Sequence, residues 1–295
     1  MSNKLFEGVG TALVTPFLSN GEIDRDSLEA LVEFQIAGGV DFLVPCGSTG
    51  ESFGLNPAGH VEVISFVVKV ANGRVPVMAG TGSNNTSEAV SLTRQAKIAG
   101  ATGVLVISPY CNKPEPAGMI DYFTQISEVG LPVCGYDIPS RTGRGVDLDI
   151  ILSLANDGVI AGIKWASEDH NQLMDIISGT PDNFFVLSGN DNSIFELMAL
   201  GGDGVISVVS NIIPDRMATF MKLFRDNSWS AAREFHYSYL PLMRAMFIET
   251  NPIPVKTALS IMGVGGIEAN FISPMSRMTE SDQVKLEEVM ATFNL

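Results

Sequence analysis

The stretch Val159-Ile160-Ala161-Gly162-Ile163-Lys164-Trp165-Ala166-Ser167 places a lysine inside a short apolar run that is typical of a buried β-strand. Lysine is rarely buried unless it is paired or has a chemical role. Burial disfavours the charged ammonium and lowers its pKa, and a neutral amine attacks carbonyl carbons to form a Schiff base. The run leaves two interpretations open: a Schiff-base lysine, or a strand-end lysine whose amine reaches solvent.

Apolar runs of the same kind recur along the chain, and each is followed by turn residues and a helical pattern. Strands that alternate with helices imply βαβ units and a parallel sheet. Eight such units within about 220 residues favour a closed TIM (β/α)8 barrel, with an open doubly wound sheet as the alternative. Besides Val159–Ser167, the predicted strands are Gly10–Phe17, Asp41–Gly47, Val75–Thr81, Gly103–Pro109, Pro132–Pro139, Phe184–Asn190 and Gly204–Asn211, and predicted helices between them include Asp26–Ala37, Pro57–Asn72 and Ser87–Ala99.

The last part of the chain is predicted to be mostly helical. Its helical patterns exceed what one final barrel helix requires, and they cover Arg216–Arg225, Ala231–Glu249, Ile253–Met262 and Ser281–Phe293. We therefore expect a barrel domain over residues 1–224. We expect a C-terminal helical extension over residues 225–295 that packs on the barrel and does not fold as a separate domain.

Composition restricts the class of protein. The chain has 295 residues, 45% of them hydrophobic, and a net charge of −15 without a basic run, which argues against nucleic acid or an anionic membrane as a partner. Met1–Glu7 has no apolar signal core, and no stretch is long enough to span a bilayer. The three cysteines, Cys46, Cys111 and Cys134, are widely spaced and do not read as a disulfide framework. We therefore expect a cytoplasmic protein.

Polar residues follow several predicted strands, at the end where TIM barrels carry their active sites. The second strand leads into Gly47-Ser48-Thr49-Gly50-Glu51-Ser52, and the fifth carries Tyr136 and leads into Ser140-Arg141-Thr142-Gly143. These groups suit carbonyl chemistry on an anionic substrate. In this interpretation Lys164 is the nucleophile, Tyr136 gives and takes protons, and Arg141 binds a carboxylate.

Each of these residues also has an ordinary structural interpretation. Ser48 and Thr49 are typical helix caps. Tyr136 is equally typical of a strand tyrosine whose hydroxyl is satisfied in the core, and Arg141 of a loop arginine.

The histidines and cysteines do not suggest a metal site. We expect His60, His170 and His236 to lie in helices or loops distant from the strand ends, where none would serve as a general base. No histidine or cysteine occurs at a metal-binding spacing. A metal-dependent aldolase is therefore disfavoured.

Four segments together resemble the dihydrodipicolinate synthase / N-acetylneuraminate lyase family of class I aldolases: Gly47–Glu51 (the GxxGE pattern), Tyr136–Gly143, Gly162–Lys164 and Asn251–Lys256. They occur in order at the appropriate barrel positions, and the resemblance covers nearly the whole chain. It implies a TIM barrel with a C-terminal helical domain, usually assembled as a tetramer of tight dimers. It also implies a Schiff base between Lys164 and pyruvate or another 2-oxo acid, with no organic cofactor and no metal.

Within this family, the segment Ser140-Arg141-Thr142-Gly143 resembles the branch that condenses pyruvate with aspartate semialdehyde in lysine and diaminopimelate synthesis. The segment Pro252–Lys256 also looks like that branch. The lyase branch tends to lack the arginine, although its members often carry the Gly-Ser-Thr-Gly-Glu form present here. The resemblance therefore favours the synthase branch and assigns Arg141 to the carboxylate of the aldehyde.

The resemblance also assigns the other site residues. Thr49 would bind the carboxylate of pyruvate, with Ile206 and Gly189 nearby. Tyr136, hydrogen-bonded to Ser48, would shuttle protons while Lys164 forms and releases the Schiff base.

One position departs from the family pattern. Synthases commonly have two adjacent tyrosines after the fourth strand, and the second reaches into the partner's site to complete a proton relay; here the pair is Tyr110-Cys111. A thiol is shorter and a weaker hydrogen-bond partner than a phenol, but its pKa of roughly 8.5 still allows proton transfer. We expect a slower relay or one rescued by water; the alternatives are a different second substrate or a disabled site.

In some synthases a lysine-feedback site lies at the dimer interface, and the matching positions here are Ser52, His60, Asn84, Glu88 and Tyr110. These positions are equally typical of an ordinary polar surface.

Three functions stay open on the sequence. They are the pyruvate-dependent synthase, N-acetylneuraminate lyase or another 2-oxo acid aldolase, and a non-catalytic barrel that binds small anions. The joint presence of Lys164, Tyr136, Thr49 and Arg141 favours the first.

Overall fold

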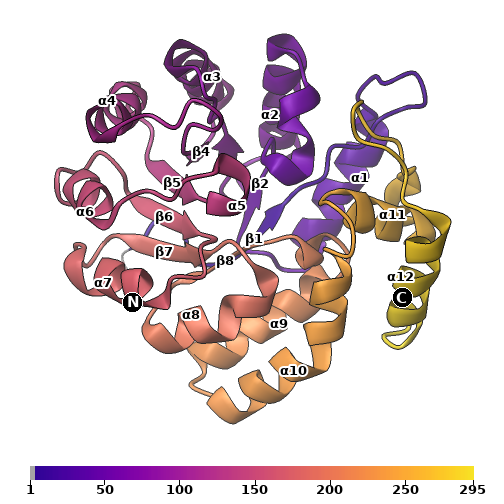
Figure 1. Cartoon of the computed structure of the whole chain (residues 1–295). Helices are drawn as coiled ribbons and strands as arrows, with labels where there is room; N and C mark the ends of the chain where they lie inside the picture. The colour runs from indigo at the N-terminus through magenta and orange to yellow at the C-terminus, as the bar shows by residue number, and fades with distance from the viewer. Residues whose placement is uncertain (1–3) are drawn as a thin grey trace.

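The computed structural model describes residues 4–295, in which eight parallel strands form a barrel inside a ring of helices (Figure 1). The strands pair in the order β2-β1-β8-β7-β6-β5-β4-β3, and a parallel bridge between Leu43 and Val77 joins the two ends of this order. The predicted TIM barrel is confirmed, and the open-sheet alternative is wrong. The strands are β1 Gly8–Ala12, β2 Phe42–Val44, β3 Met78–Gly80, β4 Gly103–Ile107, β5 Val133–Asp137, β6 Gly162–Trp165, β7 Phe185–Ser188 and β8 Gly204–Ser207.

Residues 1–3 lie outside the described part of the chain. The predicted barrel domain (1–224) and the segment Met1–Glu7, in which no export signal was expected, both begin in these residues.

The strands are shorter than the apolar runs that predicted them. In the run Val159–Ser167, regular pairing covers only Gly162–Trp165. The amides of Val159 and Ile160 instead bond to the carbonyl of Leu154, near the end of helix α6 (Leu148–Asn156). The run is apolar beyond the strand because the connecting turn is also packed in the core.

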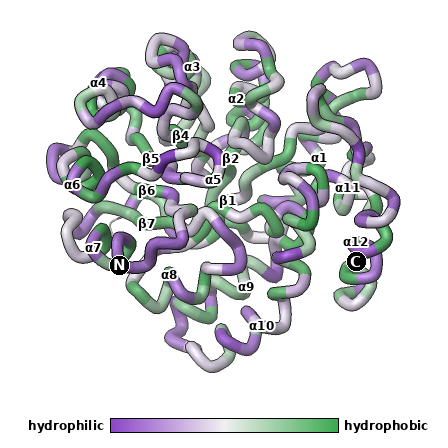
Figure 2. The backbone as a smooth tube through the Cα atoms, viewed as in Figure 1, coloured by the Kyte–Doolittle hydropathy of each residue, from purple (hydrophilic) through white to green (hydrophobic). Residues whose placement is uncertain are grey.

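Side chains alternate between the barrel interior and the layer that packs against the helices. On β6, Ile163 and Trp165 belong to the large core between strands and helices. Lys164, between them, lies beside Tyr136 in the barrel interior. Figure 2 shows hydrophobic residues running through the strands.

Aromatic rings fill the amino end of the barrel. Phe6 packs edge-on against Phe42 at 5.1 Å and against Phe185 at 5.6 Å between ring centres. A Cβ at Gly162, the first residue of β6, would lie 2.2 Å from the Phe185 ring, so only glycine leaves space for that ring. Because these rings lie at the strand starts, the interior polar groups are left to the carboxyl ends.

The helices that follow the strands match the predicted ones to within two residues where ranges were given. They are α1 Arg25–Ala37, α2 Pro57–Ala71, α3 Thr86–Ala99, α4 Pro116–Ser127, the short α5 Pro139–Thr142, α6, α7 His170–Gly179, α8 Ile194–Leu200 and α9 Pro214–Arg225. Side-chain caps explain several starts: the Asp24 carboxylate accepts from the Ser27 amide, and the Asn85 side chain accepts from Ser87 and Glu88.

The C-terminal helices are α10 Trp229–Ala245, α11 Ile253–Met262 and α12 Glu280–Ala291. α10 packs against α9 and α8, while α11 packs beside α12 and the short helix Val209–Asn211 that follows β8 (Figure 1). The predicted helix Ile253–Met262 is confirmed. The helix predicted over Ala231–Glu249 begins two residues earlier and ends four residues earlier, because turns follow Ala245. The one predicted over Ser281–Phe293 begins one residue earlier and ends two residues earlier. The division at residues 224 and 225 stays a prediction. None of the described helices is long and apolar enough to cross a membrane.

Replacing Gly162 with alanine should destabilise the barrel, because the added methyl group collides with the Phe185 ring. We expect Gly162→Ala to lower the free energy of unfolding by about 1–3 kcal/mol in a denaturant titration. Gly59→Ala, on α2, is the matched control, since its added Cβ has no neighbour closer than 3.6 Å. This control should be neutral or stabilising. Equal destabilisation of both variants would contradict the packing argument.

Candidate active site

Lys164 is buried in the centre of the barrel, with 6% of its surface exposed. It pairs in register with Tyr136 on β5, and its Nζ lies 4.2 Å from the centre of the tyrosine ring. Burial lowers the pKa of Lys164 to about 8; nearby Cys134 and Asp191 oppose this shift, and Arg141 adds to it. A substantial fraction of the amine is therefore neutral at physiological pH and able to act as a nucleophile.

Gly189, directly after β7, leaves room for the lysine side chain. A Cβ at position 189 would lie 2.6 Å from the Cβ of Ala166 and 3.2 Å from the Cε of Lys164. A larger residue would therefore collide with Ala166 and press against the Lys164 side chain. The prediction that Gly189 belongs to the site thus has a physical reason, which is the close approach of two neighbouring strands.

Tyr136 offers a proton next to the amine. Burial raises the pKa of its phenol, with Arg141 opposing the shift and Asp137 adding to it, so the hydroxyl stays protonated at neutral pH. Tyr136 and Ser48 line the same cavity. Within residues 4–295, however, the hydrogen bond predicted between them is not formed.

These side chains surround a small cavity of about 40 Å³ at the carboxyl ends of the strands. Six of the predicted site residues line it: Ser48, Thr49, Tyr136, Arg141, Lys164 and Gly189. The other lining residues, which the sequence did not single out as site residues, are Ala12, Val44, Gly47, Leu105, Ile138, Asn190, Val208, Phe247 and Asn251. An enclosed pocket with an amine, a phenol, hydroxyls and a guanidinium fits a small carboxylated carbonyl compound.

Asn251 connects two of the predicted carboxylate-binding residues. Its Nδ2 donates to Thr49 Oγ1 at 2.9 Å, and its backbone carbonyl accepts from Arg141 Nη2 at 3.2 Å. Its buried Oδ1 has no partner among the described residues. The segment Asn251–Lys256 was noticed in the sequence only as a motif, because nothing local indicates that it reaches strands more than a hundred residues away.

Asp191 is a second residue of this region that sequence reasoning missed. It is buried just after β7, and its Oδ2 accepts from the amides of Val208 and Val209 at 3.1 and 2.9 Å. Burial raises its pKa, and its hydrogen bonds and Lys164 oppose that shift. Asp191 therefore ties the end of β7 to the loop after β8, which lines the cavity through Val208.

Two predicted residues do not line this cavity. Ile206 is fully buried in the barrel interior, and Val208, two residues further on, lines the cavity in its place. Cys111 is exposed and lines an adjoining cleft instead.

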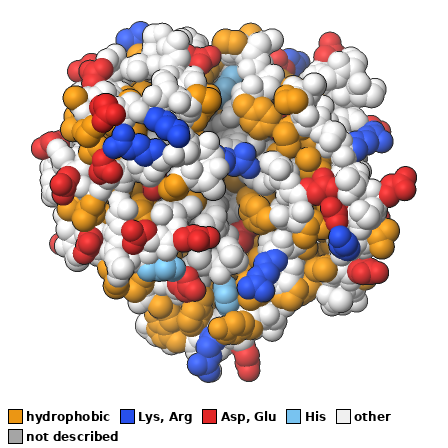
Figure 3. Space-filling view, viewed as in Figure 1, with side chains coloured by type: hydrophobic (Ala, Val, Ile, Leu, Met, Phe, Trp, Pro, Cys, Tyr) orange, Lys and Arg blue, Asp and Glu red, His pale blue; other side chains and the backbone are white. Residues whose placement is uncertain are grey.

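The adjoining cleft has a volume of about 290 Å³ and shares Ser48 and Arg141 with the cavity. It contains four of the five residues predicted for lysine feedback, which are Ser52, His60, Glu88 and Tyr110. Asn84, the fifth, does not line it; its carbonyl accepts from Asn112. Figure 3 shows the molecule hollowed near the centre of this face, with acidic and basic side chains scattered around it.

The expectation that all three histidines lie distant from the strand ends is wrong for His60. Its Nε2 lies 2.7 Å from the carbonyl of Gly80, the last residue of β3, and must donate because a carbonyl only accepts. Burial lowers the pKa of His60, which keeps the ring neutral. The prediction failed because α2 folds back over the barrel and brings a helical residue onto a strand end.

The partly neutral amine of a buried lysine can attack a carbonyl carbon. The fold and the site together therefore define a Schiff-base enzyme of the class I aldolase type. A sequence profile of the dihydrodipicolinate synthetase family matches residues 5–292. The chain belongs to this family, as its four motifs predicted.

Similar proteins match nearly the whole chain. The 4-hydroxy-tetrahydrodipicolinate synthase of Maridesulfovibrio salexigens is 48% identical, and the match covers 98% of this chain and 99% of that protein. The dihydrodipicolinate synthase of Aquifex aeolicus superposes with a TM-score of 0.96 at 40% identity, covering 98% of this chain and 99% of the other. The chloride-inhibited dihydrodipicolinate synthase from Acinetobacter baumannii complexed with pyruvate superposes with a TM-score of 0.93 at 37% identity, covering 97% and 98%.

Proposed function

We propose that this chain is a lyase that condenses pyruvate with L-aspartate semialdehyde to 4-hydroxy-tetrahydrodipicolinate, a step of lysine and diaminopimelate biosynthesis, in the cytoplasm. The observation that carries the proposal is the buried amine of Lys164, which shares a small cavity with Tyr136, Thr49 and Arg141. The similar proteins named above are synthases of this reaction, and one of them was solved with pyruvate.

In the first half of the reaction, pyruvate enters with its carboxylate toward Thr49. The neutral amine of Lys164 attacks the keto carbon, and Tyr136 donates the proton with which the carbinolamine oxygen leaves as water. The resulting imine carries a positive charge next to the pyruvate methyl group. Tyr136, left as a phenolate, then takes a methyl proton and is restored, and the electron pair moves toward the imine nitrogen to give the enamine. The imine of Lys164 accepts this electron pair, so no metal is required.

In the second half, Arg141 holds the carboxylate of the semialdehyde while the enamine carbon attacks the aldehyde carbon and forms the new C–C bond. The aldehyde oxygen takes up a proton and becomes the hydroxyl group of the product, and the enamine becomes an imine again. The amino group of the semialdehyde then attacks the imine carbon and displaces Lys164. This step closes the ring and restores the free lysine.

The second substrate distinguishes this function from that of the lyase branch. Arg141 borders the cavity and is anchored to the Asn251 carbonyl, which suits a short aldehyde with its own carboxylate. A sugar aldehyde would need hydroxyl-binding groups in place of this guanidinium. We therefore prefer the synthase to an N-acetylneuraminate lyase and to a non-catalytic anion-binding barrel.

We also propose a tetramer of two tight dimers in which Cys111 contributes to the partner's proton relay. Cys111 is exposed at the cleft that adjoins the cavity, where a second copy can reach it. Feedback by lysine in this cleft stays a prediction.

The proposal predicts that borohydride will trap pyruvate on Lys164. Reduction in the presence of pyruvate, followed by peptide mass spectrometry, should give an adduct on the peptide that contains Lys164 and none in Lys164→Ala. Adding aspartate semialdehyde before the borohydride should lower the yield, because turnover consumes the enamine. No adduct at saturating pyruvate would overturn the proposal and favour the anion-binding barrel.

The rate of adduct formation should depend on pH through Lys164. Only the neutral amine attacks, and its pKa is about 8. The rate should therefore rise about tenfold per pH unit well below the pKa and level off above it. A rate that stays flat from about pH 6 to about pH 9.5 would show that deprotonation of this lysine does not limit the reaction.

Restoring a phenol at position 111 should speed turnover, since a longer and stronger proton donor replaces a thiol. We expect Cys111→Tyr to raise kcat by about threefold to tenfold without changing the yield of the pyruvate adduct. Cys111→Phe is the matched control, because it adds the ring without the hydroxyl. Unchanged or lower turnover in Cys111→Tyr would disprove the impaired-relay idea.

A further inference from the structure

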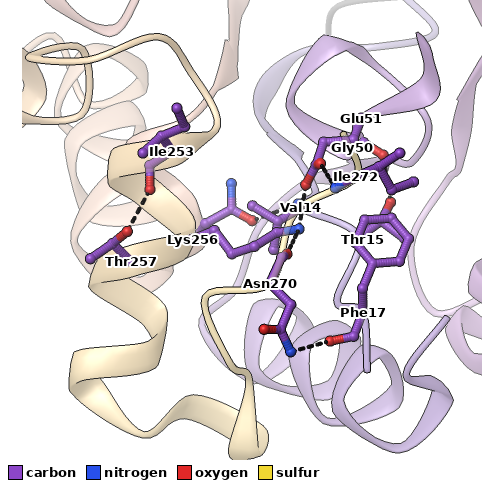
Figure 4. Close-up of polar contacts among 11 residues, drawn as sticks. Val14, Thr15, Phe17, Gly50, Glu51, Ile253, Lys256, Thr257, Asn270 and Ile272 are labelled. Atoms are coloured by element: carbon purple, nitrogen blue, oxygen red, sulfur yellow. Dashed lines mark hydrogen bonds and ion pairs between the residues drawn. The ribbon is translucent and has the colours of Figure 1, made fainter. Parts of the chain in front are cut away.

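A second buried lysine lies outside the proposed mechanism. Lys256 on α11 and Glu51 in the loop after β2 are both fully buried, and they form an ion pair although they are 205 positions apart. Figure 4 shows the two side chains meeting in the gap between the α11 ribbon and the β2 loop.

Both members of the pair make further contacts. Lys256 Nζ also donates to the Asn270 carbonyl at 2.9 Å and lies over the rings of Phe17 and Phe271, at 4.5 and 5.0 Å from their centres. The second oxygen of Glu51 accepts from the Ile272 amide at 2.8 Å. The pair therefore joins the loop after β1, the loop after β2, α11 and the segment 270–272 in one place (Figure 4).

Stability alone does not explain a buried ion pair. Taking both charges out of water offsets much of their attraction, and apolar residues of similar volume often stabilise a core as well or better. What an ion pair with additional hydrogen bonds supplies is direction, because each partner is bonded at a defined angle. The question is therefore which geometry this pair sets.

The pair lies directly behind the carboxylate-binding part of the site. Glu51 is two residues after Thr49 and has a left-handed backbone with a φ of 53°. Thr49 lines the cavity, whereas Glu51 is buried against Lys256. Lys256 is five residues after Asn251, whose side chain donates to Thr49 Oγ1 at 2.9 Å and whose carbonyl anchors Arg141. The loop and the α11 segment are thus fastened together at two points, one in the cavity and one behind it.

We propose that Glu51 and Lys256 are positioning residues, which hold the β2 loop against α11 so that Thr49 and Asn251 meet the carboxylate of the first substrate. The C-terminal extension is then a wall of the active site. This inference rests on the proposed function, because the carboxylate in question is that of pyruvate.

The test removes both charges at once. Lys256→Met alone would leave the buried Glu51 carboxylate without a positive charge beside it and endanger folding, whereas Glu51→Gln/Lys256→Met replaces both side chains by neutral ones of similar shape. We expect the double variant to fold, to need on the order of tenfold more pyruvate for half-maximal borohydride trapping of Lys164, and to show a similar rise in KM for pyruvate. Glu51→Gln alone, which retains an oxygen for the Ile272 amide, should fall between the wild type and the double variant.

Two controls separate positioning from stability. Asp282→Asn/Lys285→Met makes the same kind of change in an exposed ion pair of α12 and should leave trapping unchanged. Ile126→Ala creates a cavity beside α4, remote from the pair. It should lower the melting temperature without changing the β2 loop. Pyruvate trapping by each variant is measured at a temperature that lies the same number of degrees below the melting temperature of that variant.

The outcomes are distinct. A folded double variant that traps pyruvate with wild-type concentration dependence overturns the positioning role, and so does an equal rise in Ile126→Ala. If the double variant does not fold, Glu51→Gln is measured in its place, and wild-type trapping by that variant overturns the role. Absence of the adduct in the wild type overturns the proposed function itself.

Discussion

The removal of the Lys164 amine from water is the constraint on which the site depends. An ammonium group in the centre of a barrel loses its hydration, and among the described residues no carboxylate forms an ion pair with it. The opposing effect of nearby Asp191 is smaller than that of burial, so the pKa falls and part of the population is neutral. The barrel can impose this cost because its strands are held on both sides and its interior is filled at the other end by aromatic rings. Gly189 supplies the space that the side chain needs.

The two buried lysines show how the surroundings determine what an amine can do. Burial lowers the pKa of both Lys164 and Lys256 to about 8. Lys256 has its donors engaged by Glu51 and Asn270, so it is fixed in one geometry and is not available as a nucleophile. Lys164 lies over a tyrosine ring beside an enclosed cavity, where a carbonyl compound can approach the amine. Burial alone therefore does not identify a catalytic lysine. What distinguishes Lys164 from Lys256 is that its amine is not held by an ion pair and lies beside a cavity.

The sequence predicted the barrel because its signal is periodic and local. Eight apolar runs separated by helical patterns have few alternatives, and the strand-end rule then placed Ser48, Thr49, Tyr136, Arg141 and Lys164 at one mouth, where they line one cavity. The same rule failed for His60, because a helical residue reached the end of β3 across the surface of the barrel. It also gave no information about Asn251, because this residue follows no strand and reaches Thr49 from a segment far away in the sequence.

By itself, then, the sequence determined the fold and the succession of strands and helices, and it singled out Lys164 as a candidate, since hydrophobic periodicity and a lone cation in an apolar run are readable from neighbouring residues. Only the tertiary structure decided which distant groups meet that lysine. The contact of Asn251 with Thr49, the burial of Glu51 against Lys256 and the tie from Asp191 to the β8 loop join segments through space. Such contacts depend on how the elements pack, and no local pattern in the chain encodes them.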